Sequence, residues 1–160
     1  MKKLYITIVL AFIAIGANAQ APNWAWAKGG GGSTNDYCHG STTDAFGNVY
    51  ITGFYDSPSI IFGTTTLING GNQDIFFVKY DANGNLVWAK SIGSTGNDRG
   101  LSITTDALGN VYIAGNYESP SLTFGTTTLT NLSTNGFSDL FIAKFDASGN
   151  LVWAKTAGNA

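Results

Sequence analysis

The chain has 160 residues, of which 44% are hydrophobic and 13% aromatic, and its formal net charge is −2. With so few basic residues it lacks the Lys- and Arg-rich surface that nucleic-acid binding requires. Cys38 is the single cysteine, which excludes an internal disulfide. The apolar content predicts a globular protein with a sizeable core.

The first 19 residues have the pattern of a secretory signal peptide. Lys2 and Lys3 precede the apolar run Leu4–Ala14, and Ala17-Asn18-Ala19 forms a small-x-small cleavage site before Gln20. The apolar run is shorter than the ~20 residues that span a bilayer. We therefore expect export and cleavage before Gln20. The remaining 141 residues carry six basic and ten acidic side chains, a net charge of −4, and no segment that predicts a membrane span.

Most of the remaining chain is one unit present twice. Thr42–Leu67 and Thr104–Leu129 are identical at 20 of 26 positions with an offset of 62. Asp74–Lys90 returns as Asp139–Lys155 with 12 of 17 positions identical and an offset of 65, because three extra residues precede Asp139. Repeats of this length indicate units that bury their apolar faces by stacking on one another.

Each copy contains short runs of β-branched and aromatic residues bounded by turn residues, which predict strands. The predicted strands are 40–43, 48–53, 74–80 and 85–90 in the first copy, and 101–105, 110–115, 139–145 and 150–155 in the second. A small extra hairpin around Gly-Thr-Thr is expected at 60–67 and again at 122–129.

Residues 75–80 are apolar at both alternating sets of positions, which is typical of a sheet covered on both faces. Four antiparallel strands stacked between neighbouring copies describe a blade of a β-propeller. The predicted fold is therefore all-β, with two blades at 29–90 and 91–155, an extra N-terminal strand at 20–28, and an incomplete ring. Residues 156–160 are expected to begin a third repeat.

The sequence Asp-Ala-x-Gly-Asn occurs four times, starting at Asp44, Asp81, Asp106 and Asp146, each time between two predicted strands. Asp accepts hydrogen bonds from backbone N–H groups at the start of a turn, and Gly supplies a positive φ angle. A calcium-binding loop is the alternative, but it requires further oxygen ligands and a distal bidentate Glu that the sequence lacks. We predict hairpin turns.

Four linked motifs resemble the bacterial β-propeller repeat called SBBP: Trp-Ala-Lys, Gly-x-x-Gly-Asn-Asp, Asp-Ala-x-Gly-Asn-Val-Tyr-Ile-x-Gly and Asp-x-Phe-x-x-Lys-[Tyr/Phe]-Asp. The resemblance covers Trp24–Lys155. It implies a secreted or surface-attached propeller, often part of a longer chain, and no known catalytic residues. The first copy departs from the pattern at Tyr37-Cys38-His39, where the second has Arg99-Gly100-Leu101.

Cys38 and His39 are the only residues of their types, and they are adjacent. Neighbouring residues on a strand point to opposite faces, so the two do not form a nucleophile–base pair. A zinc site would need two further ligands. We therefore predict no catalytic residue, no metal site and no cofactor.

The tryptophans are the candidate sugar-stacking residues. Trp26, Trp88 and Trp153 recur at one repeat position, which favours packing on the last strand of a blade over ligand binding. Trp24 has no equivalent in the other copy.

The loops opposite the Asp-Ala-x-Gly-Asn turns are longer and richer in polar residues, as binding loops on a rigid scaffold often are. They are Ser33–Asp36, Phe54–Ser59, Thr95–Arg99 and Asn116–Ser121. The alternative is that the Asn-Asp pairs within them also form turns. The candidate ligand-binding residues on this face are Asn35, Asp36, Tyr55, Asn97, Asp98, Arg99 and Tyr117.

Two repeats do not close a propeller, which needs about four to eight blades. We expect the sequence to be the front of a longer propeller chain; the alternatives are that two-blade chains assemble into a closed ring, or that the two repeats fold alone as a stacked pair of sheets. We predict an exported, non-enzymatic scaffold that binds a protein or carbohydrate at the surface or in the periplasm of a Gram-negative-type bacterium. One alternative is the scaffold portion of a larger secreted enzyme whose active site lies outside this sequence. Another is a small lectin, a homo-oligomer assembled from two-blade subunits.

Overall fold

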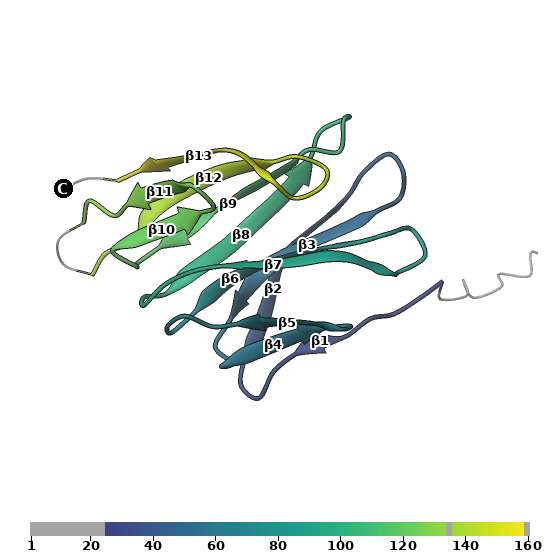
Figure 1. Ribbon diagram of the computed structural model, residues 1–160, viewed down its shortest axis with the longest axis horizontal. Coiled ribbons are helices and arrows are strands. Elements are labelled where there is room, and N and C mark those ends of the chain that lie inside the picture. Colours follow the sequence, from purple (N-terminus) through teal and green to yellow (C-terminus); the bar gives the residue numbers. More distant parts are fainter. Residues whose placement is uncertain (1–24, 134–135, 159–160) are drawn as a thin grey trace, which may run out of the picture.

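The computed structural model describes residues 25–133 and 136–158, and the predicted signal peptide and Trp24 lie outside these ranges. Two four-stranded antiparallel sheets stack face to face (Figure 1). Blade 1 has the strand order β2 (Asp36–Thr43), β3 (Val49–Tyr55), β6 (Asp74–Tyr80), β7 (Leu86–Ile92), and blade 2 has β8 (Asp98–Thr105), β9 (Val111–Tyr117), β12 (Asp139–Phe145), β13 (Leu151–Ala157). These are β-propeller blades in an open array. The described ranges contain no helix long and apolar enough to cross a membrane.

Each blade carries the predicted small hairpin between its second and third strands. The hairpins are β4 (Ser59–Phe62) with β5 (Thr65–Ile68), and β10 (Ser121–Phe124) with β11 (Thr127–Thr130). The predicted blades are 29–90 and 91–155. The first strands of the two sheets begin later than these limits, at Asp36 and Asp98, and the last strands end two residues later, at Ile92 and Ala157.

The N-terminal segment differs from the strand predicted at 20–28. Its described part, residues 25–29, contains no strand, and the short β1 (Gly30–Gly31) pairs with β4 of the small hairpin. The absence of a side chain at Gly30 explains this placement, because a Cβ atom there would overlap the Phe62 ring. The chain therefore lies along the outside of blade 1 instead of extending a four-stranded sheet.

Blade 2 covers one face of blade 1 and leaves its own equivalent face open. Ile75 and Phe77 on β6 are 1% and 0% exposed, whereas their repeat equivalents Leu140 and Ile142 on β12 are 62% and 43% exposed. All seven residues of β6 are buried, which confirms the prediction of a strand covered on both sides. We call the surface around Leu140 and Ile142 the open face of blade 2.

Aromatic rings fill the space between the two sheets. The ring centroids of Phe77 on blade 1 and Phe145 on blade 2 are 4.7 Å apart, and Trp88 meets the edge of Phe77 at 5.7 Å. On the other side of blade 1, Trp26 packs at 5.9 Å from Tyr80. Trp26 and Trp88 are thus packing residues, as predicted.

Each of the four Asp-Ala-x-Gly-Asn segments forms a hairpin turn, and the four turns have the same hydrogen-bond pattern. At Asp106, Oδ1 accepts hydrogen bonds from the backbone nitrogens of Leu108 (3.0 Å) and Asn110 (2.9 Å), and Oδ2 accepts from Asn110 Nδ2 (2.8 Å). These bonds, led by the Asn110 side chain, lower the pKa of Asp106 to about 2. Gly109 has φ +76°, a conformation that favours glycine. The same pattern recurs at the other three turns, which confirms the turn prediction.

Candidate functional site

The predicted binding residues lie at one end of the sheets, which we call the loop face. Asp36 pairs with Tyr55 across β2 and β3, and Asp98 pairs with Tyr117 across β8 and β9. The four Asp-Ala-x-Gly-Asn turns lie at the opposite ends of these strands. The structure therefore places the predicted residues at the end of the sheets opposite these turns. The Asp–Tyr pairs occupy equivalent positions in the two blades.

Within this set, Asp98 is buried and fixes the loops around it. Its carboxylate accepts hydrogen bonds from Ser119 Oγ (2.6 Å), Ser119 N (3.1 Å) and Ser94 N (3.0 Å). Burial raises the pKa of Asp98, against the effect of these hydrogen bonds. In blade 1, Asp36 Oδ2 accepts equivalent hydrogen bonds from Gly32 N and Ser57 Oγ. Both carboxylates thus hold the connections at the loop face.

The two tyrosines are 0% exposed and point into the blades. The Tyr55 hydroxyl lies 2.7 Å from Ser91 Oγ, and the Tyr117 hydroxyl lies 2.8 Å from Thr156 Oγ1. Burial raises the pKa of Tyr55 to about 12. In this arrangement neither hydroxyl faces a ligand at the surface.

Polar groups that reach the surface gather where the two blades join. Arg99 Nε donates a hydrogen bond to Gln73 Oε1 (2.5 Å), and the guanidinium lies 5.3 Å from the centre of the Phe54 ring. Asn97 Nδ2 donates to Glu118 Oε2, and Asn97 pairs with Gln73 in a β-bridge. Asn35 is exposed at the corresponding position of blade 1. Sequence reasoning missed Gln73 because its partners come from the other repeat.

Cys38 and His39 lie at a β-bulge in β2, where the register shifts between Cys38 and Gly40. The His39 ring stacks on Phe54 with centroids 5.1 Å apart, and Cys38 Sγ lies 3.7 Å from the backbone oxygen of Gly40. Burial raises the pKa of the Cys38 thiol, so it is not activated as a thiolate. The described residues contain no group of three or more His, Cys, Asp or Glu side chains that could hold a metal ion.

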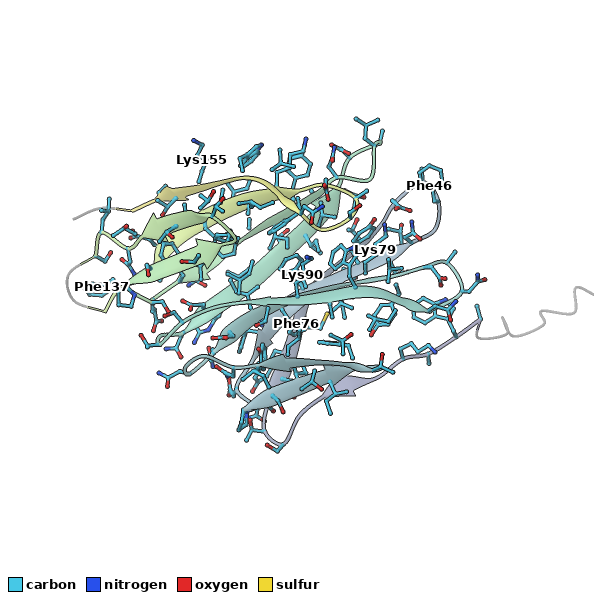
Figure 2. All side chains as sticks on the ribbon, in the orientation of Figure 1. Phe46, Phe76, Lys79, Lys90, Phe137 and Lys155 are labelled. Atoms are coloured by element: carbon cyan, nitrogen blue, oxygen red, sulfur yellow. The ribbon has the colours of Figure 1, made fainter. Side chains whose placement is uncertain are left out.

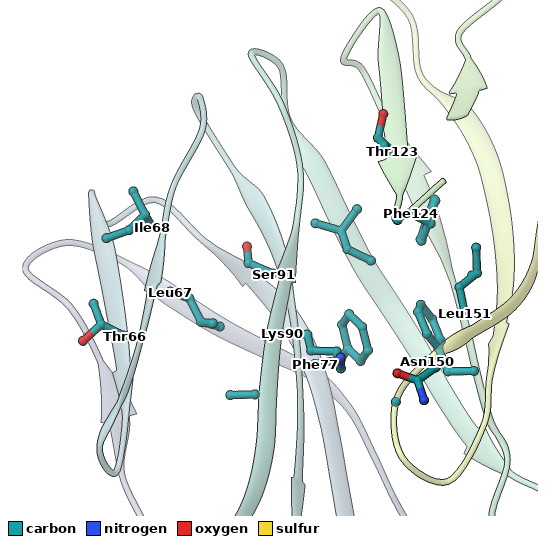
Figure 3. Close-up of a pocket in the computed structure, with 15 residues that line it drawn as sticks. Thr66, Leu67, Ile68, Phe77, Lys90, Ser91, Thr123, Phe124, Asn150 and Leu151 are labelled. Carbon is teal, nitrogen blue, oxygen red and sulfur yellow. The ribbon is translucent and has the colours of Figure 1, made fainter. Parts of the chain in front are cut away.

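A cavity of about 590 Å³ lies between the blades, and none of the predicted site residues lines it; we call it the inter-blade pocket (Figure 3). Its volume lies within the range of small-molecule sites. Lys90 and Asn150 supply polar groups on opposite walls, and Phe77 belongs to the apolar floor. The lining residues come from β5, β6, β7, the small hairpin of blade 2, the last residue of β12, the turn before β13 and the first residue of β13. Because these segments are far apart in the sequence, no local motif identifies this cavity.

The architecture defines a β-propeller-type repeat protein, a fold consistent with WD-like repeats. No family model matches the sequence. Regulatory protein FlaEY of Caulobacter vibrioides is 32% identical over 122 residues, which cover 74% of this chain and 12% of that protein. An uncharacterized WD repeat-containing protein, L264, of Acanthamoeba polyphaga mimivirus is 31% identical over 108 residues, which cover 64% of this chain and 8% of that protein. The chain thus matches only a small part of the length of both relatives.

Proposed function

We propose that the chain is an exported, non-enzymatic β-propeller scaffold of the SBBP type, which binds a protein or carbohydrate at the bacterial surface. The observation that carries the proposal is the difference between the two ends of the sheets. One end is made of four equivalent turns, and the other presents longer polar loops anchored by Asp36 and Asp98. A rigid scaffold that presents polar loops is a common basis for recognition.

Two further observations support a binding role. His39 stacks on Phe54, and Cys38 has a raised pKa, so neither residue is poised for nucleophilic catalysis. The two relatives, a regulatory protein and a WD repeat-containing protein, are of kinds compatible with action through contact.

Binding of the purified chain to intact bacterial cells and to isolated cell-surface fractions tests this function. Arg99→Ala and Asn97→Ala on the loop face should reduce binding. Phe46→Ala, at a 75% exposed position in a turn at the opposite end, is the control and should leave binding unchanged. Loss of binding in the control alone would contradict the proposal. So would an enzymatic turnover that Cys38→Ala or His39→Ala abolishes.

A homo-oligomer of two-blade subunits is the second candidate, favoured by the open face of blade 2. Leu140 and Ile142 are exposed where the equivalent residues of blade 1 are covered by a neighbouring blade. Contacts between unlike faces that close produce a ring. Sedimentation should then show a trimer or tetramer, which would dissociate in the Leu140→Asp variant. A stable monomer at all concentrations would exclude this assembly.

A further inference from the structure

The inter-blade pocket is one of three equivalent positions along the array. A second cavity, of about 320 Å³, lies between the N-terminal segment and blade 1. Its lining includes Lys28, Gly63, Tyr80, Gly84, Asn85 and Leu86. Their repeat equivalents Lys90, Gly125, Phe145, Gly149, Asn150 and Leu151 all line the inter-blade pocket. The N-terminal segment therefore reproduces the wall that β7 provides at the junction of the two blades.

The third position lies on the open face of blade 2. Leu140, Ile142, Lys155 and Thr156 line a hollow there, at the repeat positions of Ile75, Phe77, Lys90 and Ser91. Of these blade 1 residues, Phe77, Lys90 and Ser91 line the inter-blade pocket. The hollow on blade 2 therefore has the wall that carries the lysine, but no wall equivalent to Gly149, Asn150 and Leu151 faces it. A lysine thus recurs at each junction, and blade 2 offers a half-built site for comparison.

The polar groups of the inter-blade pocket are held in place by the blade turns. The absence of a side chain at Gly149 leaves room for Lys90, because a Cβ atom there would lie 2.6 Å from Lys90 Cε. Asn150 Nδ2 donates to Asp146 Oδ2 (3.1 Å), which fixes the carboxamide and leaves Oδ1 as an acceptor. Figure 3 shows Lys90 and Asn150 extending toward each other from opposite walls.

The remaining lining combines apolar side chains with the hydroxyls of Thr66, Ser91 and Thr123, and Lys90 is its one cation. The floor is formed by Phe77, Phe124 and Phe145, with centroids of neighbouring rings 4.7 and 6.2 Å apart. In the described part of the chain, no ion pair within 4 Å holds Lys90 Nζ, but its charge acts on the Asp146 carboxylate and adds to the hydrogen bonds of Asn150 that lower the pKa of Asp146. A ligand that fits has a compact body with an apolar face, an anionic group for the ammonium and a hydroxyl donor for the carboxamide.

We propose that the inter-blade pocket binds a carboxylate-bearing sugar residue of an acidic glycan. The carboxylate pairs with Lys90 Nζ, a ring hydroxyl donates to Asn150 Oδ1, and the C–H face of the sugar packs on the apolar wall. This inference deepens the proposed function by naming a glycan and its site. Because an equivalent site recurs at successive junctions, a polymer with repeated acidic residues would gain affinity through multivalency.

Titration calorimetry with oligogalacturonate tests the site, with a neutral galactose oligosaccharide of the same length as the comparison ligand. Lys90→Met should weaken oligogalacturonate binding by about tenfold or more, the effect of losing a charge-assisted hydrogen bond. Lys155→Met, at the equivalent but half-built position, is the matched control and should change affinity less than about twofold. Figure 2 shows the places of both lysines.

The outcomes separate this inference from the proposed function. Equal binding of acidic and neutral oligosaccharides, an unchanged affinity in Lys90→Met, or no binding of either oligosaccharide would overturn the assignment. If the loop-face variants still abolish binding to cells in that case, the scaffold function stands and only the glycan site is wrong. Lys90→Arg, which keeps the charge, should retain most of the affinity and so excludes loss through misfolding.

Discussion

The indole nitrogen of Trp88, on the last strand of blade 1, lies 3.5 Å from the backbone oxygen of Ala147, in a turn of blade 2. The same relationship joins Trp26 in the N-terminal segment to Ala82 in the corresponding turn of blade 1, at 3.1 Å. Each indole also lies against the positive-φ glycine of that turn. Each of these tryptophans thus contacts a turn of the blade that follows it and helps to position that blade.

Removing the Trp88 ring should therefore loosen the junction between the blades. We expect Trp88→Ala to lower the free energy of unfolding by about 2–4 kcal/mol, because the ring packs on Phe77 and Tyr50 in addition to the turn. Trp153→Ala, whose ring has Tyr112 as its aromatic neighbour on the open face of blade 2, should cost less than about 1 kcal/mol. Urea denaturation measures both, and equal losses would show that the junction does not depend on Trp88.

Comparing substitutions at two turn glycines distinguishes the effect of backbone strain from that of steric conflict. Gly109→Ala should cost about 1–3 kcal/mol because φ is +76°, while the nearest atom to the new Cβ would lie at 3.6 Å. Gly84→Ala adds a conflict with Trp26 at 2.6 Å and should be more destabilising. Thermal unfolding of both variants checks the order. If Gly109→Ala is the more damaging, the contact between Trp26 and the turn is incorrect.

Asp106 should make stability depend on pH in the acidic range. Its pKa is about 2 in the folded chain and 3.8 in the reference state, so its contribution is complete above pH 3.8 and is lost as the pH falls through about 2. Asp106→Asn removes this contribution. The difference in melting temperature between wild type and variant should therefore shrink between pH 4 and pH 2. A difference that stays constant over this range would contradict the assignment.

Replacing Asp74 by Asn should stabilise the protein at neutral pH. Asp74 is buried, Oδ2 accepts from Gly70 N, and Oδ1 has no hydrogen-bond partner in the described chain. Burial, together with the charge of Asp98, raises its pKa, so ionisation weakens the fold as the pH rises through that pKa. Asp74→Asn should raise the melting temperature at pH 7 by about 2–4 °C, an effect of ~1 kcal/mol.

The gain from Asp74→Asn should diminish as the pH falls and the wild-type carboxyl becomes protonated. Asp139→Asn is the matched control, because both Asp139 oxygens accept hydrogen bonds, from Leu132 N and Ser133 Oγ. That variant should not gain stability. A stabilisation of equal size at Asp139 would show that the unpaired oxygen of Asp74 is not the cause.

Calcium should leave the turns unaffected. Asp81 already accepts hydrogen bonds from Asn83 N, Asn85 N and Asn85 Nδ2. Asp81→Ala should therefore lower the melting temperature modestly, and millimolar calcium should shift neither wild type nor variant. A strong rise of the wild-type melting temperature with calcium, absent in Asp81→Ala, would identify these segments as metal loops.

The blades, their strand order and the turn chemistry could be predicted because each depends on local residue patterns that occur twice. Residues 75–80 are apolar at both alternating sets of positions, which predicts burial on both sides, and β6 is fully buried. The N-terminal segment was less predictable. Trp26 repeats the position of Trp88, yet its strand partners are missing from the described chain, so it packs as an extended segment.

The candidate site was predicted only in part, for two physical reasons. The sequence predicts Asp98 and Tyr117 as binding residues because they belong to polar loops, but whether such a side chain faces solvent depends on partners distant in sequence, here Ser119 and Thr156. A cavity between blades likewise depends on how two sheets stack. The signal that could have revealed the partner serine is the Ser-Pro-Ser sequence at residues 57–59, which returns unchanged at residues 119–121.

The contact between indole and turn also bears on how such arrays change in evolution. The three residues inserted before Asp139 lengthen a loop at the end of the sheet opposite this contact. They leave the contact between Trp88 and the turn of blade 2 unchanged. After duplication or deletion of a whole repeat, the repeats that become neighbours would form the same contact between indole and turn. The loops of the loop face can therefore vary in length and sequence, and the number of blades can vary by recombination. Neither change requires a new kind of junction between blades.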